Sequence, residues 1–165
     1  MTQFPPPHTL PHPFSLLVLY VVFLGADIIT IHLEACADAH EVIRQIHSCG
    51  CKAGVSIKPG TPIEVLEEYL DEVELILIMS VEPGFGGQKY IPESTERIRQ
   101  TAELIRKSGR EIELEVDGGV APDTCQTCID AGANVLVAGS AVYKAEDIPA
   151  RIKELRGKCA YESLE

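Results

Sequence analysis

Three glycine-rich segments carry the residues best suited to hold a small anion. They are EPGFGGQ at 82–88, DGGV at 117–120 and GSAVY at 139–143, and each follows a predicted strand. Glycine lets a ligand approach the main chain, and successive backbone N–H groups can surround a phosphate without a basic side chain. One such segment would indicate only a tight turn. Three of them favour a phosphate site, although none matches the P-loop or the dinucleotide-binding fingerprint.

Asp117 is the residue whose position favours acid–base chemistry. In EIELEVD, at 111–117, alternation places Glu113, Glu115 and Asp117 on one side of a strand and apolar residues on the other. Asp117 ends the strand, directly before the glycines. A carboxylate beside an anion site is unfavourable unless a cation or a proton transfer accounts for it. Asp117 is therefore a candidate for either role.

Two further groups of residues have side chains that bind metals. His32 and Glu34 lie two residues apart. They could bind a metal as a pair or belong to a polar network inside a barrel. Cys49 and Cys125 each begin a close pair, C-G-C and C-x-x-C, which could bind zinc or act in redox chemistry. The first spacing suits zinc poorly, and the second pair falls within a predicted helix. Ordinary thiols of a cytosolic protein are the better interpretation.

These side chains are positioned by a repeating strand–helix unit. The predicted strands are 26–34, 51–57, 74–81, 111–116 and 133–139. The predicted helices are 38–50, 61–70, 92–108, 121–132 and 145–156. This alternation predicts an α/β protein with a parallel sheet, either doubly wound or a barrel. In both, ligands bind at the carboxyl ends of the strands, where the glycine segments are expected.

Composition and charge limit the classes of partner. The chain has 165 residues, enough for one domain with a core, and a net charge of −11 argues against nucleic acid. The apolar run FSLLVLYVVFL at 14–24 is too short to span a membrane, and no Lys or Arg occurs before Arg44. We expect a buried strand or a non-native leader there. The prediction is a cytoplasmic protein without a membrane partner.

Several motifs together resemble one known family. SVEPGFGGQKYIPE, EVDGGV and GANVLVAGSAVY follow one another in this chain as in ribulose-phosphate 3-epimerases, and GADIITIHLEA and KAGVSIKPGTPIEVL also fit. The resemblance covers residues 25 to about 150, and the combination of motifs is highly specific. The related epimerases of ketohexose 6-phosphates share it and are not separated by these motifs.

The resemblance implies a (β/α)8 barrel that interconverts ribulose 5-phosphate and xylulose 5-phosphate. In the family one Asp removes the proton at C3, a second Asp returns one on the opposite face, and a divalent metal stabilises the enediolate. Zinc is the expected metal, with iron, manganese or cobalt as alternatives. The chemistry requires such help, because a proton beside a carbonyl is a weak acid unless the developing oxyanion is neutralised.

The family's functional residues can be carried over by position. Asp117 matches an acid–base residue that is also a metal ligand. The substrate- and phosphate-binding positions are matched by Gly84, Phe85, Gly86, Gly87, Gly118, Gly119, Gly139, Ser140 and, lining the pocket, Met79.

The resemblance also implies an incomplete barrel. About five strand–helix units can be placed, matching strands 4–8 of eight, and the family's other Asp and two His ligands come from the strands not placed. We therefore expect a leader at 1–24, a partial barrel at 25–158 and a tail at 159–165. Catalysis is expected to be impaired, and a non-catalytic phosphate-binding fragment is the alternative. An open sheet favours a homo-oligomer or association with full-length subunits.

Overall fold

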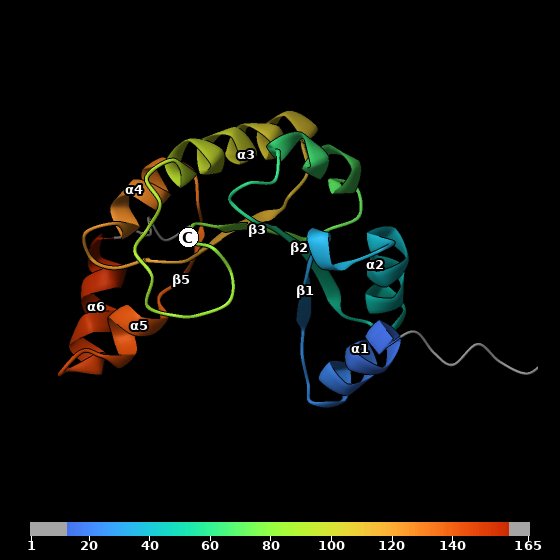
Figure 1. Ribbon diagram of the computed structural model, residues 1–165, viewed down its shortest axis with the longest axis horizontal. Helices are drawn as coiled ribbons and strands as arrows, with labels where there is room; N and C mark the ends of the chain where they lie inside the picture. The colour runs from blue at the N-terminus through green and yellow to red at the C-terminus, as the bar shows by residue number, and fades with distance from the viewer. Residues whose placement is uncertain (1–12, 159–165) are drawn as a thin grey trace, which may run out of the picture.

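A five-stranded parallel sheet forms the centre of the molecule. The computed structural model describes residues 13–158 (Figure 1). The strands are β1 Ile28–His32, β2 Lys52–Ile57, β3 Leu75–Met79, β4 Glu113–Asp117 and β5 Val135–Val137. They lie side by side in chain order, β1-β2-β3-β4-β5, and every neighbouring pair is parallel. A doubly wound sheet would reverse this order, so the architecture is that of an incomplete (β/α) barrel.

A helix precedes the first strand, helical elements follow each strand, and most of them lie along one side of the sheet (Figure 1). They are α1 Pro13–Phe23, η1 Leu33–Ala35, α2 Ala39–Ser48, η2 Ile63–Tyr69, α3 Ser94–Ser108, α4 Cys125–Asp130, α5 Gly139–Tyr143 and α6 Ile148–Lys158. Local signals set several of their ends. The side chain of Asp38 accepts a hydrogen bond from the N–H of Glu41 and caps α2, and α3 ends at Gly109, which has a φ of 68°.

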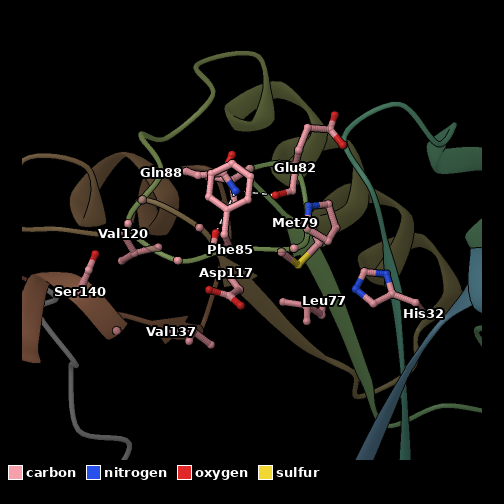
Figure 2. A pocket seen from close by; sticks show the side chains of 18 residues that line it. His32, Leu77, Met79, Glu82, Phe85, Gln88, Asp117, Val120, Val137 and Ser140 are labelled. Carbon is pink, nitrogen blue, oxygen red and sulfur yellow. Dashed lines mark hydrogen bonds between the residues drawn. The ribbon is translucent and has the colours of Figure 1, made fainter.

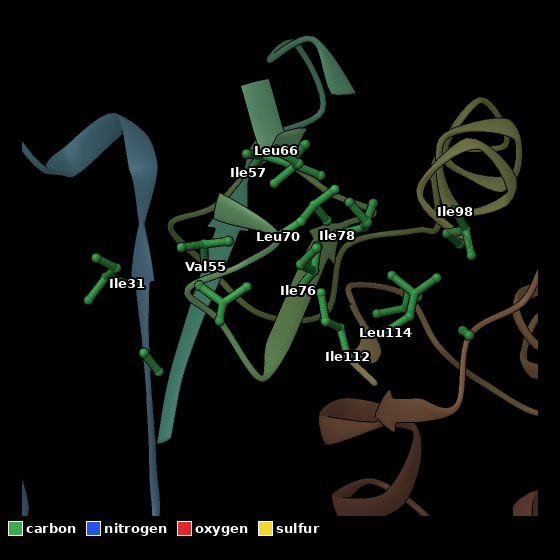
Figure 3. Packing of buried hydrophobic residues seen from close by; sticks show 14 of the residues in the cluster. Ile31, Val55, Ile57, Leu66, Leu70, Ile76, Ile78, Ile98, Ile112 and Leu114 are labelled. Atoms are coloured by element: carbon green, nitrogen blue, oxygen red, sulfur yellow. The ribbon is translucent and has the colours of Figure 1, made fainter. Parts of the chain in front are cut away.

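The two faces of the sheet differ in chemistry. Residues on the helix-covered face are aliphatic and form the core with α2, η2 and α3; Ile31, Val55, Ile76 and Leu114 are among them (Figure 3). The opposite face is mixed. Along one row of that face, the strand register places His32 beside Ser56, Ser56 beside Leu77 and Leu77 beside Glu115. The polar residues therefore lie on the face that would be the interior of a barrel.

Three predicted elements differ in the structure. The apolar run within 14–24, expected as a buried strand or a leader, belongs to helix α1, which buries Val18 against the rest of the molecule. Its apolar residues have neither strand nor helix period, and a helix satisfies its own backbone hydrogen bonds without a sheet partner. Segment 61–70 holds a 3-10 helix, η2, instead of an α-helix, and a short helix begins at Gly139.

Residues 1–12 of the predicted leader and the predicted tail at 159–165 lie outside the described residues. Among the residues that are described, no helix combines the length and the apolar character needed to cross a membrane.

Candidate functional site

A cavity of about 470 Å³ opens at the carboxyl edge of the sheet. Every residue predicted for the site lines it: Met79, Gly84, Phe85, Gly86, Gly87, Asp117, Gly118, Gly119, Gly139 and Ser140. They come from the ends of β3 and β4 and from the segments after β3, β4 and β5. These segments are far apart in the sequence and meet because parallel strands end at the same edge. Figure 2 shows the side chains around the cavity, with Asp117 between Met79 and Val137.

The loop after β3 forms one wall of the cavity. Gly84 and Gly87 have φ angles of 138° and 80°, which side chains rarely tolerate. Phe85 is 73% exposed, and its ring lies over the cavity (Figure 2). The side-chain amide of Gln88 donates to the carbonyls of Glu82 and Phe85, at 2.6 and 2.9 Å, and so holds the loop in shape. Sequence reasoning missed the role of Gln88, although its place directly after two glycines was a signal.

The turn after β4 packs tightly against the loop after β3. Gly118 and Gly119 have φ angles of 124° and 65°. A Cβ atom on Gly118 would collide with the side chain of Val81, and one on Gly119 would overlap the backbone of Tyr90. Two successive glycines are therefore required here for close approach as well as for conformation. Both line the cavity.

Asp117 is the acidic group at the centre of the site. It is the last residue of β4, pairs with Met79 on β3 and Val137 on β5, and its carboxylate is half-buried. Burial raises the pKa of Asp117 above its ordinary value of 3.8, because the charged form loses solvation. The carboxylate is thus in place beside a cavity, with a pKa displaced toward the range where a general base works efficiently.

Glu115 lies one step below Asp117 on the same face of β4. Burial raises its pKa, and the nearby charges of Asp117 and Glu113 raise it further. The alternation predicted for this strand is confirmed, because the intervening Leu114 and Val116 are buried in the core. Glu115 does not line the cavity, so Asp117 is the carboxylate of β4 that is available there to move a proton.

His32 and Glu34 belong to a polar network at the end of β1. His32 lines the cavity, and its Nδ1 lies 3.4 Å from Oε2 of Glu34. The other carboxylate oxygen of Glu34 accepts from the N–H of Lys58, at 2.8 Å, and from the hydroxyl of Thr61. Glu34 is thus engaged in joining the segments after β1 and β2, which supports the network interpretation over a metal pair.

The cysteine pairs do not form a ligand set. Cys125 and Cys128 are buried in α4 within the hydrophobic core, as the helical interpretation predicts. Across residues 13–158, no group of three or more His, Cys, Asp or Glu side chains is arranged to hold a metal ion. The described residues therefore do not fit the divalent metal site that the family resemblance implies. Asp117 is the ligand expected from sequence, and within the described part of the chain it belongs to no such group of three.

Comparison with known proteins gives consistent matches. The sequence profile of the Ribulose-phosphate 3 epimerase family matches residues 13–143, and thus begins earlier than the first recognisable motif at residue 25. "Ribulose-phosphate 3-epimerase" of Bacillus subtilis (strain 168) is 46% identical over 134 residues, which are 81% of this chain and 62% of that protein. The protein of the same name from Escherichia coli (strain K12) is 39% identical over 158 residues, 96% of this chain and 70% of that protein.

Two further matches show how much of its relatives this chain covers and which solved structures share its fold. "Ribulose-5-phosphate-3-epimerase, chloroplastic" of Arabidopsis thaliana is 46% identical, over 80% of this chain and 48% of that protein. The chain thus spans about half to two-thirds of the length of these relatives. Among solved structures, a mutant tryptophan synthase alpha-subunit from Pyrococcus furiosus matches with a TM-score of 0.68 and 22% identity, over 87% of this chain and 60% of that one. At this identity the likeness concerns the fold alone.

The matches in sequence agree with the site. The family profile spans all the strands and the three glycine segments whose residues line the cavity. The chain belongs to the ribulose-phosphate 3-epimerase family.

Proposed function

We propose that this chain binds a ketopentose 5-phosphate and that Asp117 moves the proton at C3. This is the step by which ribulose 5-phosphate and xylulose 5-phosphate interconvert. The observation that carries the proposal is a single cavity in which the half-buried carboxylate of Asp117 meets the glycine segments after β3, β4 and β5. The names of the relatives support the choice of a ribulose phosphate.

In this proposal the ends of β4 and β5 bind the phosphate. The turn at Gly118 and Gly119 offers the N–H of Gly119, and Gly139 and Ser140 line the same cavity from the segment after β5. Met79 and the loop around Phe85 enclose the sugar chain and displace water from it. Asp117, between these two regions, takes the C3 proton. Its raised pKa suits this task, because a carboxylate of higher pKa is a stronger base and removes a carbon-bound proton faster.

Inversion at C3 requires a second proton donor on the opposite face of the substrate. The described cavity contributes Asp117 on one face, with Glu82 on the rim as the other lining carboxylate. We therefore propose that proton exchange is faster than inversion and that epimerisation is impaired. Zinc, or iron, manganese or cobalt, stays the metal that the resemblance implies; no step is assigned to it, because the described residues do not form its ligand set.

The test follows hydrogen at C3 and the two sugars at once. The purified chain is incubated with ribulose 5-phosphate in deuterated water, and NMR measures both deuterium at C3 and the amount of xylulose 5-phosphate. We expect deuterium to enter recovered ribulose 5-phosphate faster than the epimer forms. Equal rates would show that the chain supplies a second acid, and absence of exchange would contradict the role of Asp117.

Two alternative functions would use the same cavity, and measurements of ligand binding and proton exchange distinguish them. A non-catalytic phosphate-binding protein would bind ribitol 5-phosphate in a calorimeter without promoting exchange. This is the second candidate, because Asp117 is the carboxylate placed for acid–base chemistry among the described cavity residues and Glu82 lies at the rim. A ketohexose-6-phosphate 3-epimerase would exchange the C3 proton of the longer substrate faster than that of ribulose 5-phosphate.

We also propose a cytoplasmic location and self-association, or association with longer subunits of the same family. β1 pairs with β2 alone within the described sheet, and α1 exposes large apolar side chains. Both features favour contact with another copy.

A further inference from the structure

Ser80 joins the two segments that form most of the cavity, although it does not line the cavity itself. It directly follows β3 and is 0% exposed. Its N–H donates to the carbonyl of Asp117, at 2.8 Å. Its hydroxyl lies 2.6 Å from the carbonyl oxygen of Gly118 and 3.0 Å from that of Asp117. Its own carbonyl accepts from the N–H of Ile91, at 2.9 Å, which closes the base of the loop after β3.

These hydrogen bonds determine the direction of two peptide planes. The described chain contains no cis peptide bond, so each C=O points opposite to the following N–H. Because Ser80 holds the carbonyls of Asp117 and Gly118, the N–H groups of Gly118 and Gly119 point away from β3. That direction leads toward β5, whose end contributes Val137, Gly139 and Ser140 to the same cavity. The N–H of Gly118 points along the β4–β5 ladder, and that of Gly119, the first beyond the paired residues, is thus aimed where an anion can bind.

The turn needs such an external constraint. Gly118 and Gly119 lack side chains, and glycine has the widest backbone freedom of all residues. The peptide between them could therefore rotate and turn its carbonyl toward the ligand, which would repel a phosphate. The hydroxyl of Ser80 opposes this rotation, because it would leave a fully buried donor without its acceptor.

We propose that Ser80 is a positioning residue for phosphate binding: it holds the Asp117–Gly118–Gly119 turn so that the N–H of Gly119 faces the ligand. It acts from behind the turn and never touches the substrate. This role rests on the proposed function only in taking a phosphorylated ligand, and it does not depend on turnover.

The test compares variants that differ in the hydroxyl alone. Ser80→Thr keeps the hydroxyl and Ser80→Val replaces it with a methyl group of the same shape. Ser80→Ala removes it without adding volume. Ser94→Ala is the matched control, because Ser94 is also 0% exposed but its hydroxyl has no hydrogen-bond partner. Each full chain, labelled with 15N-glycine, is titrated with ribitol 5-phosphate and with unphosphorylated ribitol by calorimetry and NMR.

We expect Ser80→Ala and Ser80→Val to bind ribitol 5-phosphate about tenfold more weakly than Ser80→Thr, the loss expected for one hydrogen bond. Binding of ribitol should not change, Ser94→Ala should match the unaltered chain, and the Gly119 amide resonance should move in Ser80→Ala before ligand is added. Should Ser80→Ala fail to fold, the comparison of Thr with Val decides.

Equal affinity of Ser80→Thr and Ser80→Val for ribitol 5-phosphate would overturn the proposal, as would an unaltered chain that does not bind this ligand. A chain that binds it in a Ser80-dependent way but never exchanges the C3 proton would sustain the role of Ser80 and refute the proposed catalysis. The two proposals therefore fail by different observations.

Discussion

Asp117 has two properties that a proton-transferring carboxylate needs, access to a cavity and reduced solvation. Burial raises the pKa of Asp117 above the ordinary 3.8. The carboxyl group therefore ionises, and becomes able to accept a proton, at a higher pH than an exposed aspartate does. The position of the carboxylate at the strand end follows from alternation in the sequence. The change in its pKa follows from the packing around it.

The substitution Asp117→Asn should lower the rate of C3 proton exchange by at least about 100-fold, because an amide of the same shape cannot accept the proton. Binding of ribitol 5-phosphate should persist, since the phosphate is held elsewhere. In the unaltered chain the exchange rate should rise with pH through the raised pKa of Asp117. NMR exchange measurements across pH test this, with Glu113→Gln, an exposed residue of the same strand, as control. Full exchange by Asp117→Asn would point to another base.

Glu115 gives a prediction about stability. Burial, then the charges of Asp117 and Glu113, raise its pKa in the folded protein above the ordinary 4.5. The folded state therefore favours the protonated form, and the stability that protonation contributes is present at pH below 4.5 and lost as the pH rises through the folded pKa. Glu115→Gln should be more stable than the unaltered chain at pH 8, with the difference vanishing near pH 4.

Urea unfolding at the two pH values measures this difference. Glu67→Gln, at an exposed position of η2, is the control and should show no such dependence. A stability gain of Glu115→Gln that is larger at pH 4 than at pH 8 would contradict the assigned direction of the pKa change.

At the scale of elements, the loop after β3 depends on a side chain for its shape. Gln88 donates two hydrogen bonds to the loop's own carbonyls, at Glu82 and Phe85. Gln88→Ala should leave the fold intact but make the amides of residues 84–88 exchange faster. It should also weaken the binding of ribitol 5-phosphate by about tenfold.

Hydrogen-exchange mass spectrometry and calorimetry test this prediction. Gln100→Ala is a suitable control, because Gln100 is exposed on α3 and contacts Glu96 by a long 3.4 Å hydrogen bond. Similar protection of the loop in both variants would mean that the glycines alone maintain its conformation.

The turn after β4 should be far less tolerant of a side chain than the tip of the neighbouring loop. Gly119 has a φ of 65°, and a Cβ there would overlap the backbone of Tyr90. Gly119→Ala should cost about 2 kcal/mol of unfolding free energy or more. Gly86→Ala, where a Cβ meets nothing within 4 Å, should cost less than about 0.5 kcal/mol. Chemical denaturation of the two variants provides the comparison, and equal costs would contradict the close packing.

For the whole molecule, helix α1 presents the largest group of exposed apolar side chains. Leu19, Tyr20 and Phe23 are 55%, 62% and 87% exposed. Exposed apolar surface of this kind is a site of association in soluble proteins. Replacing all three by Gln, which retains helix propensity, should lower the average mass measured by light scattering.

Tyr143→Gln is the control for this experiment, because Tyr143 is 80% exposed but lies on α5, away from α1 (Figure 1). It should leave the average mass unchanged. If the triple replacement in α1 also left it unchanged, the surface of α1 would not mediate self-association.

The parts of the fold that were predictable have a local origin. Four of the five strands lie within the predicted ranges and β4 extends one residue further, to Asp117, because runs of β-branched residues between turn residues are visible in a short window. Helix α1 was missed because a uniformly apolar segment has no period. Ser80 was missed because its partners, Asp117 and Gly118, are 37 and 38 residues away and no local pattern connects them.

By itself, the sequence determined the alternation of strands and helices, the placement of glycines at three strand ends and the side of β4 on which Asp117 stands. These follow from periodicity and from the conformational freedom of glycine, which are properties of neighbouring residues. Only the tertiary structure decided that the glycine segments share one cavity, that Asp117 loses solvation and that Ser80 hydrogen-bonds to the turn from behind. Distances, burial and hydrogen bonds between distant segments exist only once the sheet has brought them together.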